Sequence, residues 1–140
     1  PAHLASGSDM RTTLALVLTL AAAAALAQTA MTPDDFDAWS RGKTLAYSVD
    51  GVIFGSEAYF ADRQVRDADT GGPCLDGSWF ADGNAVCFVY PARDGIHCWT
   101  YWRDGESVFA KPVAADPGDP AQRVTVADTP LTCPGPEVGV

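Results

Sequence analysis

The chain has 140 residues, of which 47% are hydrophobic and 10% aromatic, and its formal net charge at pH 7 is −9. This length provides for one domain with a hydrophobic core, and the aromatic content is too high for a disordered acidic tail. Because the chain is acidic and has no basic stripe, we expect no nucleic acid and no anionic lipid surface among its partners.

The N-terminal residues predict export. A basic start at Met10 and Arg11, an apolar run over residues 12–26 and a small-x-small cleavage site ending at Ala27 are typical of a signal peptide over residues 10–27. Residues 1–9 precede the best start codon, and we interpret them as an upstream extension from a misassigned start or as a cloning remnant.

Removal of the signal peptide leaves residues 28–140 as a single β domain with an irregular C-terminal tail. This part keeps the net charge of −9, because one acidic and one basic residue precede it. We expect it to be periplasmic or secreted, to have no stable membrane insertion after cleavage, and to be a monomer.

A short helix is predicted over residues 33–40. Thr32 provides an N-cap, Pro33 suits the first helical position, and the two aspartates that follow complement the helix dipole. Phe36 and Trp39 are three residues apart and therefore share one face of this helix.

After this helix the hydrophobic period changes to two. Asp-Gly pairs, which favour hairpin turns, occur at 50–51, 76–77, 82–83, 94–95 and 104–105. The runs between them predict strands over 44–49, 52–60, 63–68, 78–81, 85–90, 96–103, 106–111 and 122–127. We therefore expect a mainly β fold, a small antiparallel barrel or sandwich with meander topology and one short N-terminal helix over an open end or a face.

The four cysteines of this chain predict two disulfide bonds, because their number is even and the chain is expected to be exported. If the chain turns over residues 91–94, Cys87 lies opposite Cys98 on the adjacent strand, which leaves Cys74 for Cys133. The other two connectivities stay open, since a register shift of one residue would place Cys87 and Cys98 on opposite faces.

Two metal-site hypotheses are weak. A zinc site of Cys87, His97 and Cys98 conflicts with the strand pleat, because adjacent residues point to opposite faces. Asp67-x-Asp69 resembles the opening of a calcium loop, but Ser78 stands where the bidentate glutamate belongs. We expect no metal and no cofactor.

No catalytic motif stands out. His97 is the only histidine in residues 28–140, no Gly-x-Ser-x-Gly motif occurs, and Asp69-Thr70-Gly71 lacks the flanking residues of an aspartic protease loop. We therefore expect a protein that is not an enzyme. The enzymatic alternative that remains pairs His97 with a nearby carboxylate.

Aromatic residues mark the candidate binding surface. We expect one cluster across neighbouring strands, with Trp79 and Trp102 pointing the other way; its members are Phe80, Phe88, Tyr90, Trp99 and Tyr101. Because strand 96–103 has large aromatic residues on both faces, one face must be covered or used for binding. The candidate binding residues are His97, Trp99, Tyr101, Trp102 and Arg103.

Several segments resemble a group of small exported proteins of unassigned function from alphaproteobacteria. The segments are Gly-Lys-Thr-Leu-Ala-Tyr at 42–47, Gly-Ser-Glu-Ala-Tyr at 55–59, Cys-Leu-Asp-Gly-Ser-Trp at 74–79, Val-Cys-Phe-Val-Tyr at 86–90, Cys98-Trp99 and the terminal Cys-Pro-Gly-Pro-Glu-Val-Gly-Val at 133–140. The resemblance implies export and a compact β domain, and it transfers no activity.

Together these features predict an exported non-enzymatic binding module for a small apolar ligand or an envelope protein partner. The alternative is a proteinaceous inhibitor of a basic enzyme such as lysozyme, since a charge of −9 would speed the encounter with a cationic partner.

Overall fold

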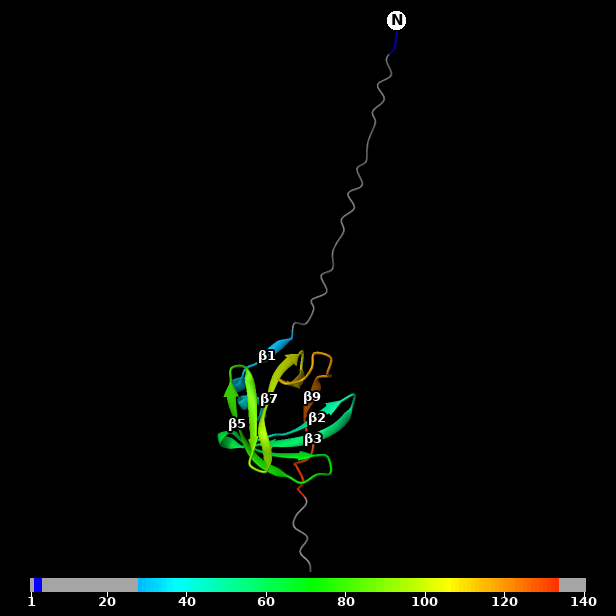
Figure 1. Cartoon of the computed structure of the whole chain (residues 1–140). Helices are drawn as coiled ribbons and strands as arrows, with labels where there is room; N and C mark the ends of the chain where they lie inside the picture. Colours follow the sequence, from blue (N-terminus) through cyan, green and yellow to red (C-terminus); the bar gives the residue numbers. More distant parts are fainter. Residues whose placement is uncertain (1, 4–27, 134–140) are drawn as a thin grey trace, which may run out of the picture.

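The computed structural model describes residues 2–3 and 28–133, and strands cover most of the second range (Figure 1). In chain order the elements are β1 (Thr29–Met31), α1 (Pro33–Ser40), β2 (Thr44–Val49), β3 (Val52–Tyr59), the 3-10 turn η1 (Ala61–Arg63), β4 (Gln64–Asp69), β5 (Leu75–Asp82), β6 (Ala85–Tyr90), β7 (Arg93–Asp104), β8 (Ser107–Pro112) and β9 (Gln122–Val126). The expected signal peptide and residues 134–140 of the expected tail lie outside the described residues.

The strands form a closed antiparallel barrel. Each strand from β2 to β8 pairs with the next, and β9 pairs with both β8 and β2, which closes eight strands into an up-and-down barrel. The predicted barrel is therefore confirmed, and the sandwich alternative is wrong. β1 is an additional strand that the sequence analysis missed, and it pairs with residues 101–103 of β7.

The predicted helix is confirmed, and it plugs one end of the barrel. The Thr32 hydroxyl accepts from the Asp35 backbone N–H at 3.1 Å, and the Asp35 carboxylate accepts from the Thr32 N–H at 3.2 Å. Phe36 is fully buried, and its ring centre lies 5.3 Å from that of Tyr59 and 4.2 Å from that of Tyr101. Within the described residues, no helix has the length and apolar character needed to span a membrane.

Three of the five Asp-Gly pairs lie at hairpin turns. At the first, between β2 and β3, both central residues have positive φ, 49° at Asp50 and 78° at Gly51, as a type I′ turn requires. In the 82–83 and 104–105 pairs, the aspartate is the last residue of one strand and the glycine is the first residue of the turn to the next.

The turns expected at Asp76-Gly77 and Asp94-Gly95 are wrong. Gly77 lies inside β5, where a Cβ atom would come within 2.5 Å of the Tyr90 ring. This glycine is needed for close packing between strands and not for a turn. The second pair forms a bulge within β7, because Val89 pairs with Ile96 while Tyr90 pairs with Arg93.

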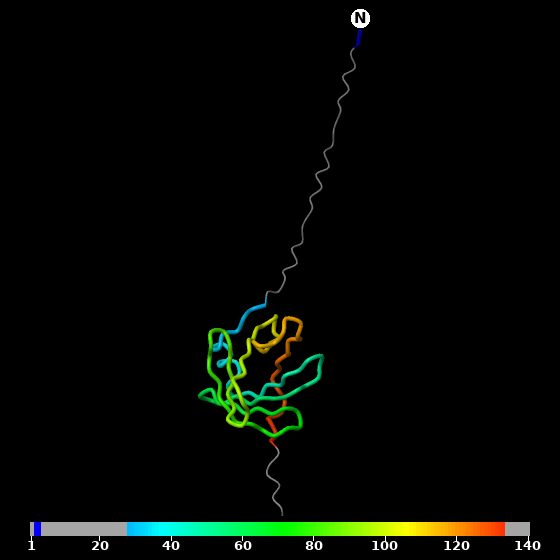
Figure 2. The backbone as a smooth tube through the Cα atoms, viewed as in Figure 1, coloured from blue at the N-terminus to red at the C-terminus, as the bar shows by residue number. Residues whose placement is uncertain are grey.

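Two disulfide bonds join Cys87 to Cys98 and Cys74 to Cys133. The β6–β7 turn is at residues 91–92 and not over 91–94, but the bulge absorbs the two extra residues, so that Cys87 still lies opposite Cys98. The second bond ties the segment after β9 to the start of β5 (Figure 2). Two such bonds are typical of an oxidising compartment.

One part of the expected aromatic cluster is wrong. Trp79 lies opposite Phe88 across the β5–β6 pair, and directly opposed residues share a face, so Trp79 belongs to the core with 4% of its surface exposed. Phe80 is on the outer face and is 41% exposed.

Phe36→Ala should destabilise the barrel by about 3–5 kcal/mol, because it removes a fully buried ring and leaves a cavity among aromatic neighbours. Urea unfolding measures the change in the free energy of unfolding. Phe80→Ala is the matched control, and it should cost less than about 1 kcal/mol. Equal losses in the two variants would contradict the role of Phe36 as the plug.

The Cys74–Cys133 bond should stabilise the fold more than the Cys87–Cys98 bond. It closes a loop with a sequence separation of 59 residues against 11, which corresponds to about 4 against about 3 kcal/mol in the chain-entropy model. The measurement is the urea midpoint of the two Cys→Ala double variants. A larger loss for the Cys87/Cys98 pair would contradict this order.

Candidate functional site

The barrel encloses a cavity of about 190 Å³ between its strands. Tyr101 lines this cavity and also packs against Phe36, so the plugged end forms its floor. Phe54 and Asp69 line its mouth and are exposed to solvent. The full lining is Tyr47, Phe54, Gly55, Glu57, Asp67, Asp69, Phe88, Tyr90, Arg93, His97, Trp99, Tyr101 and Gln122.

The pleat of the strands determines which side chains face the cavity. Lining residues recur with a period of two at 55 and 57 in β3, at 67 and 69 in β4, at 88 and 90 in β6, and at 97, 99 and 101 in β7. In a closed barrel the inward positions of all strands converge on one space. Residues far apart in the sequence therefore meet here.

Three tyrosine hydroxyls form a buried network at the inner side of the cavity. The Tyr47 hydroxyl lies 2.6 Å from that of Tyr59 and 3.0 Å from that of Tyr101. Burial raises the pKa of all three phenols well above the ordinary value. They therefore stay neutral, and each can both donate and accept a hydrogen bond.

Glu57 is the central polar group of the site. Its residue surface is 6% exposed, and its Oε2 accepts a hydrogen bond of 3.0 Å from the Tyr90 hydroxyl. Its Oε1 has no hydrogen-bond partner among the described residues. Burial, followed by the charge of Asp67 on the adjacent strand, raises the pKa of Glu57 well above its ordinary value of 4.5, so the protonated form is favoured.

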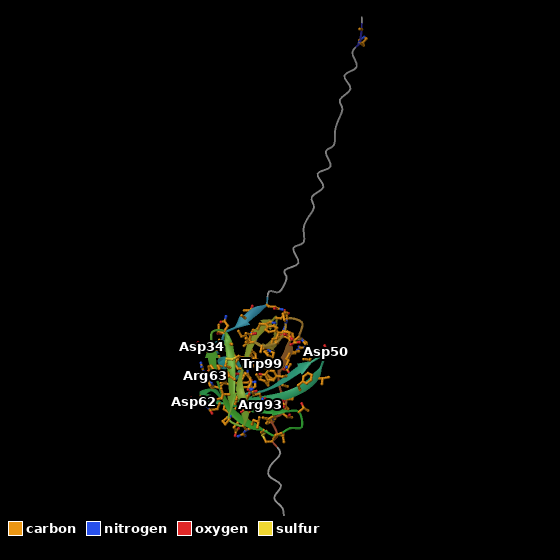
Figure 3. The ribbon with its side chains drawn as sticks, viewed as in Figure 1. Asp34, Asp50, Asp62, Arg63, Arg93 and Trp99 are labelled. Atoms are coloured by element: carbon orange, nitrogen blue, oxygen red, sulfur yellow. A yellow bond between two sulfur atoms is a disulfide. The ribbon has the colours of Figure 1, made fainter. Side chains whose placement is uncertain are left out.

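Arg93 neutralises the second carboxylate of the site. Its guanidinium lies 3.2 Å from Asp67 Oδ2 and 5.0 Å from the centre of the Tyr90 ring. Figure 3 shows Arg93 and Trp99 against the strands that surround the cavity. Among the lining residues there are three carboxyl groups against one guanidinium and one imidazole.

The structure brings together three of the five candidate binding residues. His97, Trp99 and Tyr101 line the cavity. Trp102 does not, since it stacks on Phe109 with 6.1 Å between ring centres. Arg103 lies over the Trp39 ring at 5.7 Å, beside the plug. The inner face of β7 thus contributes to the cavity, and the ring on its outer face packs against β8.

The sequence analysis missed Glu57 and Arg93 as site residues, and it considered Asp67 only as part of a calcium loop. The inward position of Glu57 could have been found from its period-two spacing with Gly55 and Tyr59, but an acidic residue in a strand is normally assigned to the outer face. Arg93 was expected in a turn, and only the bulge places it in β7.

The zinc site considered from the sequence conflicts with this arrangement. Zinc cannot bind at Cys87 and Cys98, because both sulfurs are in a disulfide. In addition, the described residues contain no group of three or more His, Cys, Asp or Glu side chains placed to hold a metal. His97 Nε2 lies 3.0 Å from the backbone carbonyl oxygen of Asp94, so this contact is with the backbone and not with a carboxylate.

No protein-family model, curated protein or solved structure matches this chain significantly. The resemblance to exported alphaproteobacterial proteins therefore stays a prediction. The function must be argued from the cavity itself.

Glu57→Gln should stabilise the protein at alkaline pH and have little effect at pH 4. Burial raises the pKa of Glu57 in the folded protein above 4.5. The folded protein is therefore most stable with respect to this group below that pH, and it loses stability as the pH rises toward the folded-state pKa. Glutamine resembles the protonated acid and does not ionise. Thermal unfolding at pH 4 and pH 8 should give a gain of several degrees at pH 8 only.

Glu106→Gln, in the exposed turn after β7, is the matched control. It should leave the melting temperature nearly unchanged at both pH values. A Glu57→Gln variant that is less stable than the wild type at pH 8 would contradict the inference that the buried acid is protonated.

Proposed function

We propose that this protein is an exported, non-enzymatic barrel that binds a small ligand in its cavity. The observation that carries the proposal is a space of about 190 Å³ inside a closed barrel, plugged at one end by Phe36 and open at the other. Concave sites with many aromatic side chains and a few convergent polar groups are typical of small-molecule binding.

The lining supports a ligand with both an apolar and a polar part. Six aromatic rings surround the space, but so do Glu57, Asp67 and Arg93. A wholly apolar ligand would leave Glu57 Oε1 without a partner. The volume is below the roughly 300–1,000 Å³ typical of drug-sized ligands, so the proposed ligand is small.

The lining also supports a binding role rather than catalysis. It contains no serine, threonine or cysteine that could act as a nucleophile with His97. Glu57 and Asp67 are directly opposed on adjacent strands and interact through their carboxyl groups. This places them closer together than the roughly 5 Å or more that separates the two acids of most glycosidases.

Native mass spectrometry tests the proposal. The purified protein is incubated with a small-molecule extract of bacterial periplasm, and a non-covalent adduct of low mass is expected. Gln122→Trp should abolish the adduct, because residue 122 lines the cavity and the larger ring would fill it.

Arg123→Trp is the matched control, because the neighbouring residue is exposed on the outside of the same strand, and the adduct should persist. Tryptophan fluorescence gives a second readout, and Trp99→Phe should remove most of any ligand-dependent change. An adduct that survives in Gln122→Trp, or a wild-type protein that binds nothing, would contradict the proposal.

One observation favours the inhibitor of a basic enzyme as the second candidate function. The β2–β3 hairpin extends away from the barrel (Figure 1), with Asp50 at its tip (Figure 3). Next to the tip, Val52, Ile53 and Phe54 are 60%, 51% and 54% exposed. An apolar tip on a chain of charge −9 suits a cationic protein partner.

Lysozyme activity at low salt tests this candidate. Inhibition should fall when Ile53 and Phe54 are both replaced by serine, because the tip then loses its apolar surface. Unchanged lysozyme activity with excess wild-type protein would rule out that target.

A further inference from the structure

The cavity is lined by a buried carboxyl group that, once ionised, has one oxygen for which the described residues supply no donor. Glu57 lines the cavity and is 6% exposed, its Oε2 is bound by Tyr90, and its buried Oε1 has no hydrogen-bond partner among the described residues. A buried oxygen without a donor is unfavourable, and it is more so when the group is charged. A ligand that donates a hydrogen bond would relieve this.

The charges of the lining favour a cation. Arg93 is engaged with Asp67, which leaves Glu57 without a positive partner when it ionises. The surrounding rings favour the same sign, because the face of an aromatic ring attracts a cation, most strongly when both are desolvated. Five rings lie in the wall around this carboxyl group, those of Tyr47, Phe88, Tyr90, Trp99 and Tyr101.

We infer that the ligand is a small protonated amine whose N–H group donates to Glu57 Oε1 and whose apolar part lies among the rings of Phe88 and Trp99. This inference rests on the proposed ligand-binding function and names the chemical class of that ligand. The unpartnered oxygen selects an amine with an N–H group over a quaternary ammonium ion, which has no donor.

Binding of the amine displaces a proton. In the empty cavity, burial and then the charge of Asp67 favour the protonated form of Glu57. The incoming cation stabilises the carboxylate. The O–H bond of the acid breaks, its proton passes to solvent or buffer, and no covalent bond to the ligand forms. The ionisable groups that face Glu57 or line the same cavity are Tyr47, Tyr59, Asp67, Asp69, Tyr90, Arg93, His97 and Tyr101.

Calorimetric titration with four probes that share one ring tests the inference. The probes are benzylamine, which is cationic at pH 7.5, neutral benzyl alcohol, apolar toluene and benzyltrimethylammonium, a cation without N–H. We expect benzylamine to bind at least tenfold more tightly than the other three. Titration in two buffers of different ionisation enthalpy should show about one proton released per amine bound.

Glu57→Gln should weaken benzylamine binding by ~10-fold or more, because a hydrogen bond to a charged group is lost, and it should abolish the proton release. Glu106→Gln, whose carboxylate is exposed outside the cavity, should change neither. Thermal unfolding of each variant shows that it is folded before titration.

The outcomes separate the two proposals. If benzyl alcohol or toluene binds as well as benzylamine and Gln122→Trp abolishes that binding, the cavity binds ligands but the amine class is wrong. If benzylamine binds with the same affinity to Glu57→Gln, the role of the carboxylate is overturned. If none of the four probes binds, the amine inference falls, and the periplasmic-extract experiment then decides the proposed function by itself.

Discussion

Closure of the sheet through β9 is the constraint on which the rest of the structure depends. β9 pairs with β8 on one side and with β2 on the other, so no strand of the eight has a free edge. Once the ring is closed, each inward side chain faces the same interior space. Whether that space is solid or hollow then depends only on the volumes of the inward residues at each level.

The two ends of the barrel interior differ in how completely side chains fill them. At the plugged end, Phe36, Tyr59 and Trp79 fill the space with ring-to-ring contacts. Toward the mouth, Gly55 contributes no side chain, and carboxyl groups line the cavity together with the rings. The packed half supplies the burial that stabilises the barrel. This stability allows the other half to retain a buried acid, although removing that acid from water lowers the stability of the fold at alkaline pH.

Local chemistry made much of the fold predictable. The bounds of α1 and of the strands 44–49 and 85–90 agree with the sequence analysis, because capping residues and runs of β-branched and aromatic residues act over a few positions. The positions that failed depend on contacts between distant segments. Asp76-Gly77 has the composition of a turn, but the Tyr90 ring on the adjacent strand determines the need for glycine there.

The site was harder to predict than the fold for the same reason. His97, Trp99 and Tyr101 could be placed on one face by their alternation, whereas Asp67 and Tyr90, the neighbours of Glu57, come from two other strands. Within β3 only the period-two spacing with Gly55 and Tyr59 indicates the inward position of Glu57. Pairing with β4 places Asp67 opposite it, and the curvature of the barrel brings the Tyr90 hydroxyl of β6 to it.

Gly77, in the middle of β5, affects the position of Glu57 through the Tyr90 ring, although β5 contributes no side chain to the cavity lining. The Tyr90 ring lies against the bare backbone at this position, and the same ring carries the hydroxyl that holds Glu57. A methyl group here would push the ring, and with it the hydroxyl that donates to the carboxyl group, out of place. Position 77 thus sets the place of the Glu57 carboxyl group through packing alone, although glycine has no side chain with which to touch it.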